Sequence, residues 1–216
     1  MNQEWSELNK TMQLQIKKKT TFAAGIATLL DLREKLMEEL LSIKREISPA
    51  DFSAMPFPNA KGYHSKTITY SIWHTIRIED IVVHSLILQD DEIFRSHQSS
   101  IGAPIITTGN ELAEPQITDF SRMLNIDALY NYTTAVKNST EEWLRTLSYQ
   151  ELKRTFGDED KARLKALQVV STDENATWLI DFWCRKNIRG LIQMPLSRHW
   201  IMHIEASIRI WNKLKG

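Results

Sequence analysis

The stretch TITYSIWHTIRIEDIVVHSLILQ, residues 67–89, decides the fold class of this chain. Wound as an α-helix, it carries apolar residues on nearly all sides, which is typical of a helix buried in a protein core. Its longest apolar run is interrupted by His84 and Ser85 and is far too short to span a bilayer. We therefore predict that these residues form the most buried helix of a globular protein.

Apolar residues recur at helical spacing on both sides of this stretch. We predict a first helical stretch at about residues 13–44, a third at about 117–147 with a break near Asn125, and a last one over 171–189 that is followed by a terminal helix over 195–214. A short helix is expected in DEDKARLKAL, residues 158–167. These are four main helical stretches.

The ends of the last stretch carry recognisable signals. Ser171 opens the pattern S-T-D-E, a capping box that indicates a helix start. Gly190 is the expected C-cap, and Pro195 suits the first turn of the terminal helix.

Two long loops are predicted, at residues 49–66 and 96–116. A loop as long as the second is uncommon in a compact domain and often covers a site. Gly and Pro are scarce, at 7 and 6 residues, which disfavours a β protein rich in tight turns. The chain is therefore predicted to be all-α, a four-helix bundle in which residues 1–216 form a single domain.

The amino-acid composition limits the cellular compartment and the classes of partner that we expect for this protein. Acidic and basic residues balance at 27 each, so charge predicts no nucleic-acid partner and no membrane attachment. Cys184 is the single cysteine, so no internal disulfide can form, which fits a reducing compartment. The N-terminal MNQEWSELNK lacks the apolar core of a signal peptide, and we expect a cytoplasmic protein.

Histidines on predicted helices are the candidate functional residues. On the central helix, Arg77, Asp80 and His84 share one narrow stripe, which predicts that His84 is exposed. His74 points almost the opposite way and is predicted to face inward. His64 and His97 lie in or beside loops, where a solvated side chain is the ordinary state.

The terminal helix carries a pair of histidines four residues apart. His199 and His203 stack on one face, which also carries Ala206 and Ile210 and is predicted to face inward. Such a pair is a ready clamp for a metal ion, and a third imidazole from His74 would leave a coordination position open. The alternative for each buried histidine is an ordinary core residue bonded to a neighbour. Three of them inside one bundle favour the metal site, because unpartnered imidazoles are costly to bury.

The sequence lacks the residue spacing that several other types of catalytic or metal site require. A zinc-protease motif needs Glu directly after the first histidine, and that position is Trp200. A ferritin-like di-iron site needs two Glu-x-x-His pairs, and the sequence has none. It also has no G-x-S-x-G, no Gly-rich phosphate loop and no CxxC. Cys184, between Trp183 and Arg185, is interpreted as a packed small residue rather than a nucleophile.

Two motifs resemble one known family. The segment WHTIRIED, residues 73–80, resembles the first-ligand helix of the DinB-like superfamily, and HWIMH, residues 199–203, resembles its late HxxxH. The order of elements along most of the chain is also similar. The resemblance implies a four-helix bundle of the DinB/YfiT-like type, commonly a homodimer, with His74, His199 and His203 as ligands of a divalent metal ion such as zinc or nickel.

The same resemblance implies an activity on a small-molecule substrate. Characterised members include S-transferases and isomerases that use a low-molecular-weight thiol, such as mycothiol or bacillithiol, as cosubstrate. One departure is the segment IEAS, residues 204–207, where many members have a small or polar tail that ends in Arg. It leaves the ligands intact and leaves the particular substrate open.

Three further residues have defined expectations. Glu79 lies among apolar residues and is predicted to pair with a buried arginine or to support the site from behind. Tyr130 and Tyr132 either line the pocket or pack in the bundle. The rival function is a non-catalytic dimeric module for binding or stress response, in which the histidines are structural or bind a metal without catalysis.

Overall fold

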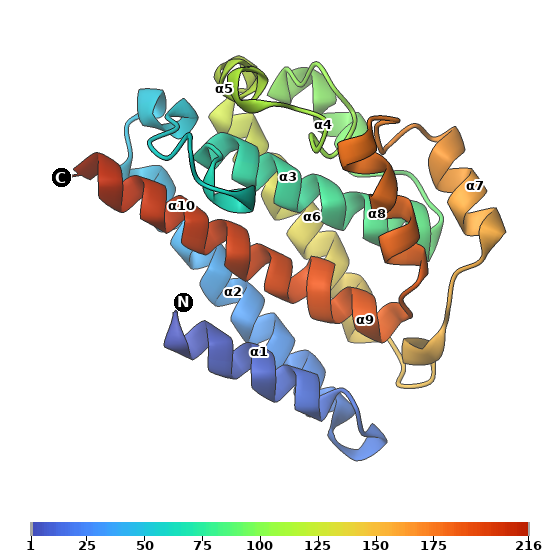
Figure 1. Cartoon of the computed structure of the whole chain (residues 1–216). Coiled ribbons are helices and arrows are strands. Elements are labelled where there is room, and N and C mark those ends of the chain that lie inside the picture. Colours follow the sequence, from blue (N-terminus) through green and yellow to red (C-terminus); the bar gives the residue numbers. More distant parts are fainter. Residues whose placement is uncertain (1, 216) are drawn as a thin grey trace.

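The computed structural model describes residues 2–215, and every regular element within them is helical (Figure 1). The α-helices are α1 (Gln3–Gln15), α2 (Phe22–Glu46), α3 (Ile68–Asp80), α4 (Phe94–Ile101), α5 (Glu114–Met123), α6 (Ile126–Thr146), α7 (Asp158–Ala166), α8 (Glu174–Cys184), α9 (Ile188–Gln193) and α10 (His199–Lys215). Short 3-10 turns lie at Lys19–Thr21, Pro49–Ser53, Gly62–His64 and Glu151–Lys153, and π-helical turns at Ile81–Leu88 and Met194–Arg198. The predicted all-α class is therefore confirmed.

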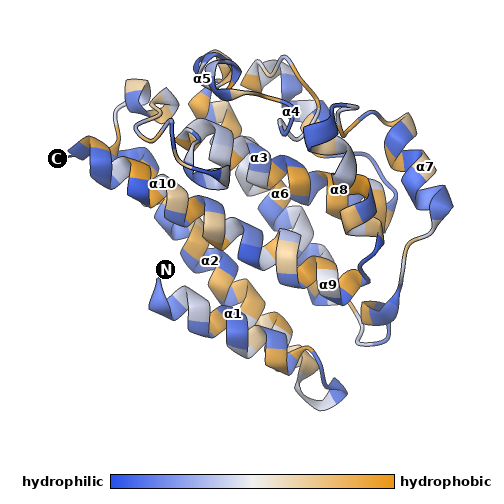
Figure 2. Cartoon of the chain, in the orientation of Figure 1, coloured by the Kyte–Doolittle hydropathy of each residue, from blue (hydrophilic) through white to orange (hydrophobic). Residues whose placement is uncertain are grey.

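Four of the helices pack against one another in a ring, and the buried apolar residues form two clusters. Helix α2 contacts α10, α10 contacts α3, α3 contacts α6, and α6 contacts α2, which closes the ring. Hydrophobic and hydrophilic residues alternate along α2 and α10 (Figure 2), as expected of helices with one buried side. Helix α1 lies along α2, while α7 and α8 pack on each other beside the ring. The predicted central helix is confirmed, because every residue of α3 is buried.

A buried ionic network ties the four helices together. Arg33 on α2 donates two hydrogen bonds to Glu79 on α3, at 2.9 and 2.7 Å, and both side chains are fully buried. Arg33 also contacts Glu141 on α6 at 3.3 Å, and Trp200 on α10 donates its indole N–H to Glu79 at 2.6 Å. The prediction that Glu79 pairs with a buried arginine is confirmed.

A second buried network involves the stripe that was predicted to be exposed. Arg77 contacts Asp80 and the hydroxyl of Tyr132, both at 3.2 Å, and Glu92 at 2.9 Å. It also donates to the backbone carbonyl of Ile106 in the loop after α4. Partners that are distant in the sequence therefore neutralise the charges of Arg77 and Asp80 inside the protein. The sequence pattern had predicted that these side chains face solvent.

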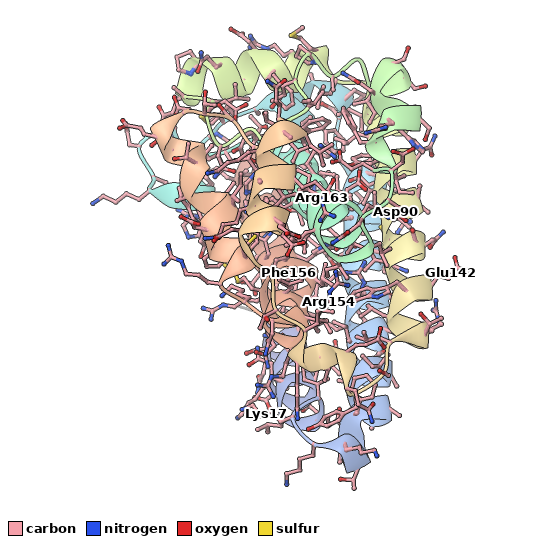
Figure 3. The ribbon with its side chains drawn as sticks, turned by 90° about the vertical axis from the view of Figure 1, so that its right-hand side faces the viewer. Lys17, Asp90, Glu142, Arg154, Phe156 and Arg163 are labelled. Carbon is pink, nitrogen blue, oxygen red and sulfur yellow. The ribbon has the colours of Figure 1, made fainter. Side chains whose placement is uncertain are left out.

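The prediction that His84 is exposed is wrong for the same reason. Its side chain is buried within the π-helical turn, with 3% of the residue exposed. Nδ1 donates to the carboxylate of Asp90 at 2.7 Å, and Nε2 forms a hydrogen bond with the hydroxyl of Ser139 at 3.1 Å. The end of this turn is held by two arginines, Arg154 and Arg163, which point toward it in Figure 3 and donate to the carbonyls of residues 87 and 86.

The first predicted stretch, residues 13–44, is two helices. Helix α1 begins ten residues earlier in the chain, and the chain turns before α2. A Cβ at Gly25 would lie 2.6 Å from Cγ2 of Ile16, so α1 and α2 cross closely at this glycine. Thr21 donates its hydroxyl to the carbonyl of Gln15 at 2.7 Å and closes the end of α1.

The predicted stretch over residues 171–189 is also divided. Helix α8 begins after Asp173, whose carboxylate accepts from the backbone N–H of Asn175, rather than at Ser171. It ends before residue 189, because Asn187 caps a new helix by accepting from the N–H of Gly190 at 3.0 Å. Gly190 therefore lies inside α9 and is not a C-cap.

Other boundaries follow the prediction more closely. The third stretch is broken at Asn125, whose side chain caps α6 by accepting from the N–H of Ala128. The short helix in residues 158–167 is present as α7. The second predicted loop, residues 96–116, is shorter than expected because α4 and α5 occupy its ends. Within the described residues, no helix has both the length and the apolar content needed to cross a bilayer.

Candidate metal centre

His74 enters the site from the middle of α3. Its Nδ1 donates to the backbone carbonyl of Thr108 at 2.8 Å, since a carbonyl can only accept. This bond fixes the tautomer and leaves Nε2 with a free lone pair, the arrangement usual for a metal-binding histidine. Tyr70, one turn earlier, stacks on the imidazole with an interplanar angle of 9°. The ring is therefore held on two sides before any ligand is present.

The loop between α4 and α5 supplies that carbonyl, so this predicted loop lies against the histidine cluster. Gly109 has a φ of 78°, in the left-handed region, and its carbonyl accepts from the Tyr70 hydroxyl at 3.0 Å. Arg77 holds the loop at Ile106. Thr108 contributes a backbone atom, so no pattern of side chains in the sequence marks it.

His199 and His203 enter from the first turns of α10. The π-helical turn with Pro195 leads into this helix, and Ser197 donates to the carbonyl of Ile192 at 2.8 Å. The bond between Trp200 and Glu79 fixes the rotation of α10 against α3. Both histidines consequently face the helix that carries His74.

The three imidazoles converge on one point. One ring nitrogen from each of His74, His199 and His203 lies within 4.8 Å of the other two. The ring centroids are 4.6 to 5.1 Å apart, and all three residues are buried. Nitrogen ligands of a divalent ion each lie about 2.0–2.1 Å from it, so a shared ion fits with small side-chain adjustments.

Burial keeps the three histidines neutral. The pKa of His74 is lowered to about 4, chiefly by burial, while the hydrogen bond to the Thr108 carbonyl opposes this shift and the charge of Lys66 adds to it. The pKa values of His199 and His203 are also well below the ordinary value, first through burial and then through repulsion among the rings. Neutral imidazoles are the form that binds a metal, so no proton has to leave at pH 7.

The hydrogen bonding of the pair on α10 is incomplete. Nδ1 of His199 and Nδ1 of His203 are buried and have no hydrogen-bond partner within residues 2–215. A buried polar atom without a partner costs about 1–3 kcal/mol. Both rings therefore retain the capacity for another partner, and the donor set of three imidazoles suits zinc, nickel, copper or iron.

The centre opens into a cleft of about 360 Å³. This volume suits a small molecule. The three histidines form part of its lining, and the remainder is largely aromatic and apolar, with Tyr63, Tyr70, Trp178, Phe182, Trp183, Met194 and Met202 among the lining residues. Two polar side chains, Lys66 and Asn110, also line it. No motif in the sequence marks these residues, which come from loops, from α8 and from the helices that carry the histidines.

The other candidate residues lie outside this cleft. Tyr130 and Tyr132 pack in the bundle, where their hydroxyls donate to the carbonyl of Leu40 and to Asp80. Cys184 is buried, and burial raises its thiol pKa to about 11, so it stays protonated. Glu79 does not line the cleft and acts on the site indirectly, because it accepts the hydrogen bond from Trp200 on α10.

The Ser139–His84–Asp90 chain has the order of a catalytic triad but not its surroundings. Ser139 lies inside α6, where the helix already uses the backbone N–H groups that an oxyanion hole would need. We assign this chain of hydrogen bonds a structural role between the π-helical turn and α6. His64 and His97, predicted to be solvated, are half-buried beside Tyr63 and Tyr132.

No family model matches this sequence, and no curated protein matches it either. The structure brings together the three histidines that the sequence singled out. Metal binding by them, and membership of the DinB-like superfamily, stay predictions.

Proposed function

We propose that this chain is a divalent-metal-dependent enzyme of the DinB-like type, a cytoplasmic homodimer whose four long helices form that family's bundle. The proposed ligands are His74, His199 and His203, and the proposed metal is zinc or nickel. The proposed reaction is an S-transfer or isomerisation that uses a low-molecular-weight thiol and a small-molecule substrate.

One observation carries this proposal. Three neutral imidazoles converge at the base of a cleft of about 360 Å³ rather than in a closed interior. Structural metal sites are closed by four protein ligands, whereas catalytic sites keep a position open for water or substrate. Among the described residues, these three form one group of close ligand atoms, and no fourth His, Cys, Asp or Glu joins it.

A bound divalent ion would act as a Lewis acid and lower the pKa of a thiol, which favours the nucleophilic thiolate. The chain itself supplies the positioning. Thr108 and Tyr70 hold His74, and the Glu79–Trp200 bond holds the helix of the other two ligands. The aromatic side chains of the cleft exclude water from the reacting group.

The rival is a non-catalytic dimeric module for binding or stress response. An open cleft beside the histidines favours the enzyme, because idle or structural histidines require no access from solvent. Replacement of all three histidines would leave the biological activity of such a module unchanged, whereas it would abolish the activity of a metal enzyme.

Elemental analysis tests the metal site. The untagged protein, purified without chelator, should carry about one divalent ion per chain. The His199→Ala/His203→Ala variant should lose it, and His97→Gln, a change outside the cleft, should retain it. Thiol-transfer reactions are then screened with the metal that was found. A native protein that carries no metal and takes none up would refute the proposal.

A further inference from the structure

The cleft beside the three histidines contains an unbalanced positive charge. Lys66 lines it and is half-buried, and among residues 2–215 its ammonium group has no hydrogen bond or ion pair. Its one specific contact is with the ring of Tyr70, 5.0 Å from the ring centroid. Burial lowers the pKa of Lys66, with a smaller opposing effect from Glu114, as expected for a cation that has lost water without gaining a carboxylate.

No acidic side chain offsets this charge within the cleft. The described residues that line it include no Asp and no Glu. Lys66 lines the same cleft as the three histidines. A divalent ion on three neutral imidazoles would add two further positive charges to the same space. Desolvated like charges repel strongly, so the loaded cleft requires anionic groups from its ligand.

Asn110 adds a hydrogen-bond donor to the same lining. Its side-chain oxygen accepts from the hydroxyl of Thr108 at 2.7 Å, so the amide nitrogen is the group left for a ligand. That nitrogen has no hydrogen-bond partner among the described residues. One ammonium and one amide N–H match one carboxylate, which carries a single charge and accepts several hydrogen bonds.

The rest of the lining suits an apolar body. Trp178 and Phe182 contact each other edge to face, with centroids 5.5 Å apart, and both line the cleft together with Trp183. Trp178 is 49% exposed, a large aromatic surface left at the mouth. Aromatic walls with a few convergent polar groups are typical of small-molecule sites.

We propose that the substrate or cosubstrate of this cleft is a small molecule with an apolar part and a carboxylate that is separate from the group that binds the metal, and that Lys66 recognises this carboxylate. This inference rests on the proposed metal site, because the other group of the molecule binds there. Lys66 is a specificity-determining residue that contacts the ligand and takes no part in bond making or breaking.

A cobalt-substituted protein tests this proposal. Cobalt(II) replaces the metal, and a thiol probe that binds as a thiolate, with its proton released to the buffer, gives a thiolate-to-cobalt absorption band. The probes are mercaptoacetate, 3-mercaptopropionate and 4-mercaptobenzoate, each beside its uncharged amide. At least one acid should bind about 10-fold or more tightly than its amide, since a hydrogen bond to a charged group is worth about that much.

Three variants identify the residue responsible. Lys66→Met should abolish the preference for the acid and leave the amide affinity within about twofold. Lys66→Arg should restore the preference, because it restores the charge. Lys61→Met is the matched control, since Lys61 is an exposed lysine of the same loop outside the cleft lining. It should keep the preference, while an equal loss in this variant would mean that only net charge matters.

The outcomes separate this inference from the proposed function. Failure to take up cobalt, or absence of the band with every thiol, would refute the metal site. The acid and amide pairs are therefore also titrated into metal-free protein, where emission from Trp178 and Trp183 reports on the cleft. If wild-type protein shows no preference for an acid in either form, or if Lys66→Met keeps it, the carboxylate site is overturned.

Discussion

Arg33 and Glu79 form a bidentate salt bridge in the interior of the protein, and both side chains are fully buried. Nη2 of the arginine lies 2.7 Å from Oε1 of the glutamate. The pair joins α2 to α3, and Trp200 extends it to α10. A charge buried without its partner is costly, so each member depends on the other.

Replacement of Arg33 by Met is expected to lower the free energy of unfolding by about 3–5 kcal/mol, because Glu79 would keep a buried charge without its main partner. Urea denaturation of the metal-free protein measures this change. The control is Asp127→Asn, which breaks the exposed pair with Lys44 and should cost under about 1 kcal/mol. Equal losses in the two variants would contradict the role given to the buried network.

Much of the architecture could be predicted from apolar spacing, because periodicity reports which side of a helix is buried. It identified the inward faces that carry His74, His199 and His203. The same periodicity gave a wrong prediction for His84, because a stripe of polar residues on a helix was interpreted as a face exposed to solvent. One partner of that histidine, Ser139, is 55 residues away along the chain, and one sequence without its relatives contains no signal for such a pairing.

The proposed metal ligands could be predicted from the sequence, whereas the loop residues around them could not. The HxxxH spacing marks two ligands. The carbonyl of Thr108 and the loop lysine Lys66 have no pattern, since their positions depend on how a loop folds over α3. The break between α8 and α9 was not predicted either. Asn187 lies within a helical pattern of apolar residues, but its side chain caps a new helix and so competes with continuation of the first one.

The backbone at Gly109 is expected to control metal affinity through its neighbour Thr108. In Gly109→Ala, a Cβ would lie 3.1 Å from the Tyr70 ring at a φ of 78°, so the loop must shift and the bond to His74 weakens. We expect metal affinity to fall by roughly tenfold, as for other partners that orient a ligand. Competition with a coloured chelator measures it.

Gly102→Ala is the matched control for this variant. Gly102 also has a positive φ, 72°, and therefore suffers the same backbone strain, but its nearest neighbour is the carbonyl of Met123, away from the site. Both variants should lose about 1–2 kcal/mol of stability. Only the change at residue 109 should weaken metal binding, and a similar loss in both would point to general loosening of the fold.

Metal binding should stabilise the folded chain. An ion that binds the native state alone adds about 2.7 kcal/mol at 100 times its Kd, or roughly 5–10 °C in Tm for a chain of this length. Differential scanning fluorimetry with zinc and with nickel measures the shift, and a chelator should reverse it. The His199→Ala/His203→Ala variant should show no shift, so a rise in its Tm would place the ion elsewhere.

Acid should destabilise the metal-free protein through the buried histidines. The pKa of His74 is lowered to about 4 by burial, whereas an unfolded chain has an ordinary value near 6.5. Between these values the unfolded state binds more protons, so stability rises with pH and is lost as the pH falls from 6.5 toward 4. His74 alone accounts for roughly 3 kcal/mol over this window, and the lowered pKa values of His199 and His203 act in the same direction.

Urea denaturation of metal-free protein at intervals between pH 7 and pH 4.5 measures this dependence. A variant with Gln at all three positions cannot titrate there, so its stability should change much less over the same window. Metal-loaded protein should hold its ion to a lower pH than exposed imidazoles would, since protons compete weakly for rings with depressed pKa values. A flat profile for the wild-type protein would show that the three rings are not buried together in solution, and the cleft would then lack the neutral donor set on which metal binding depends.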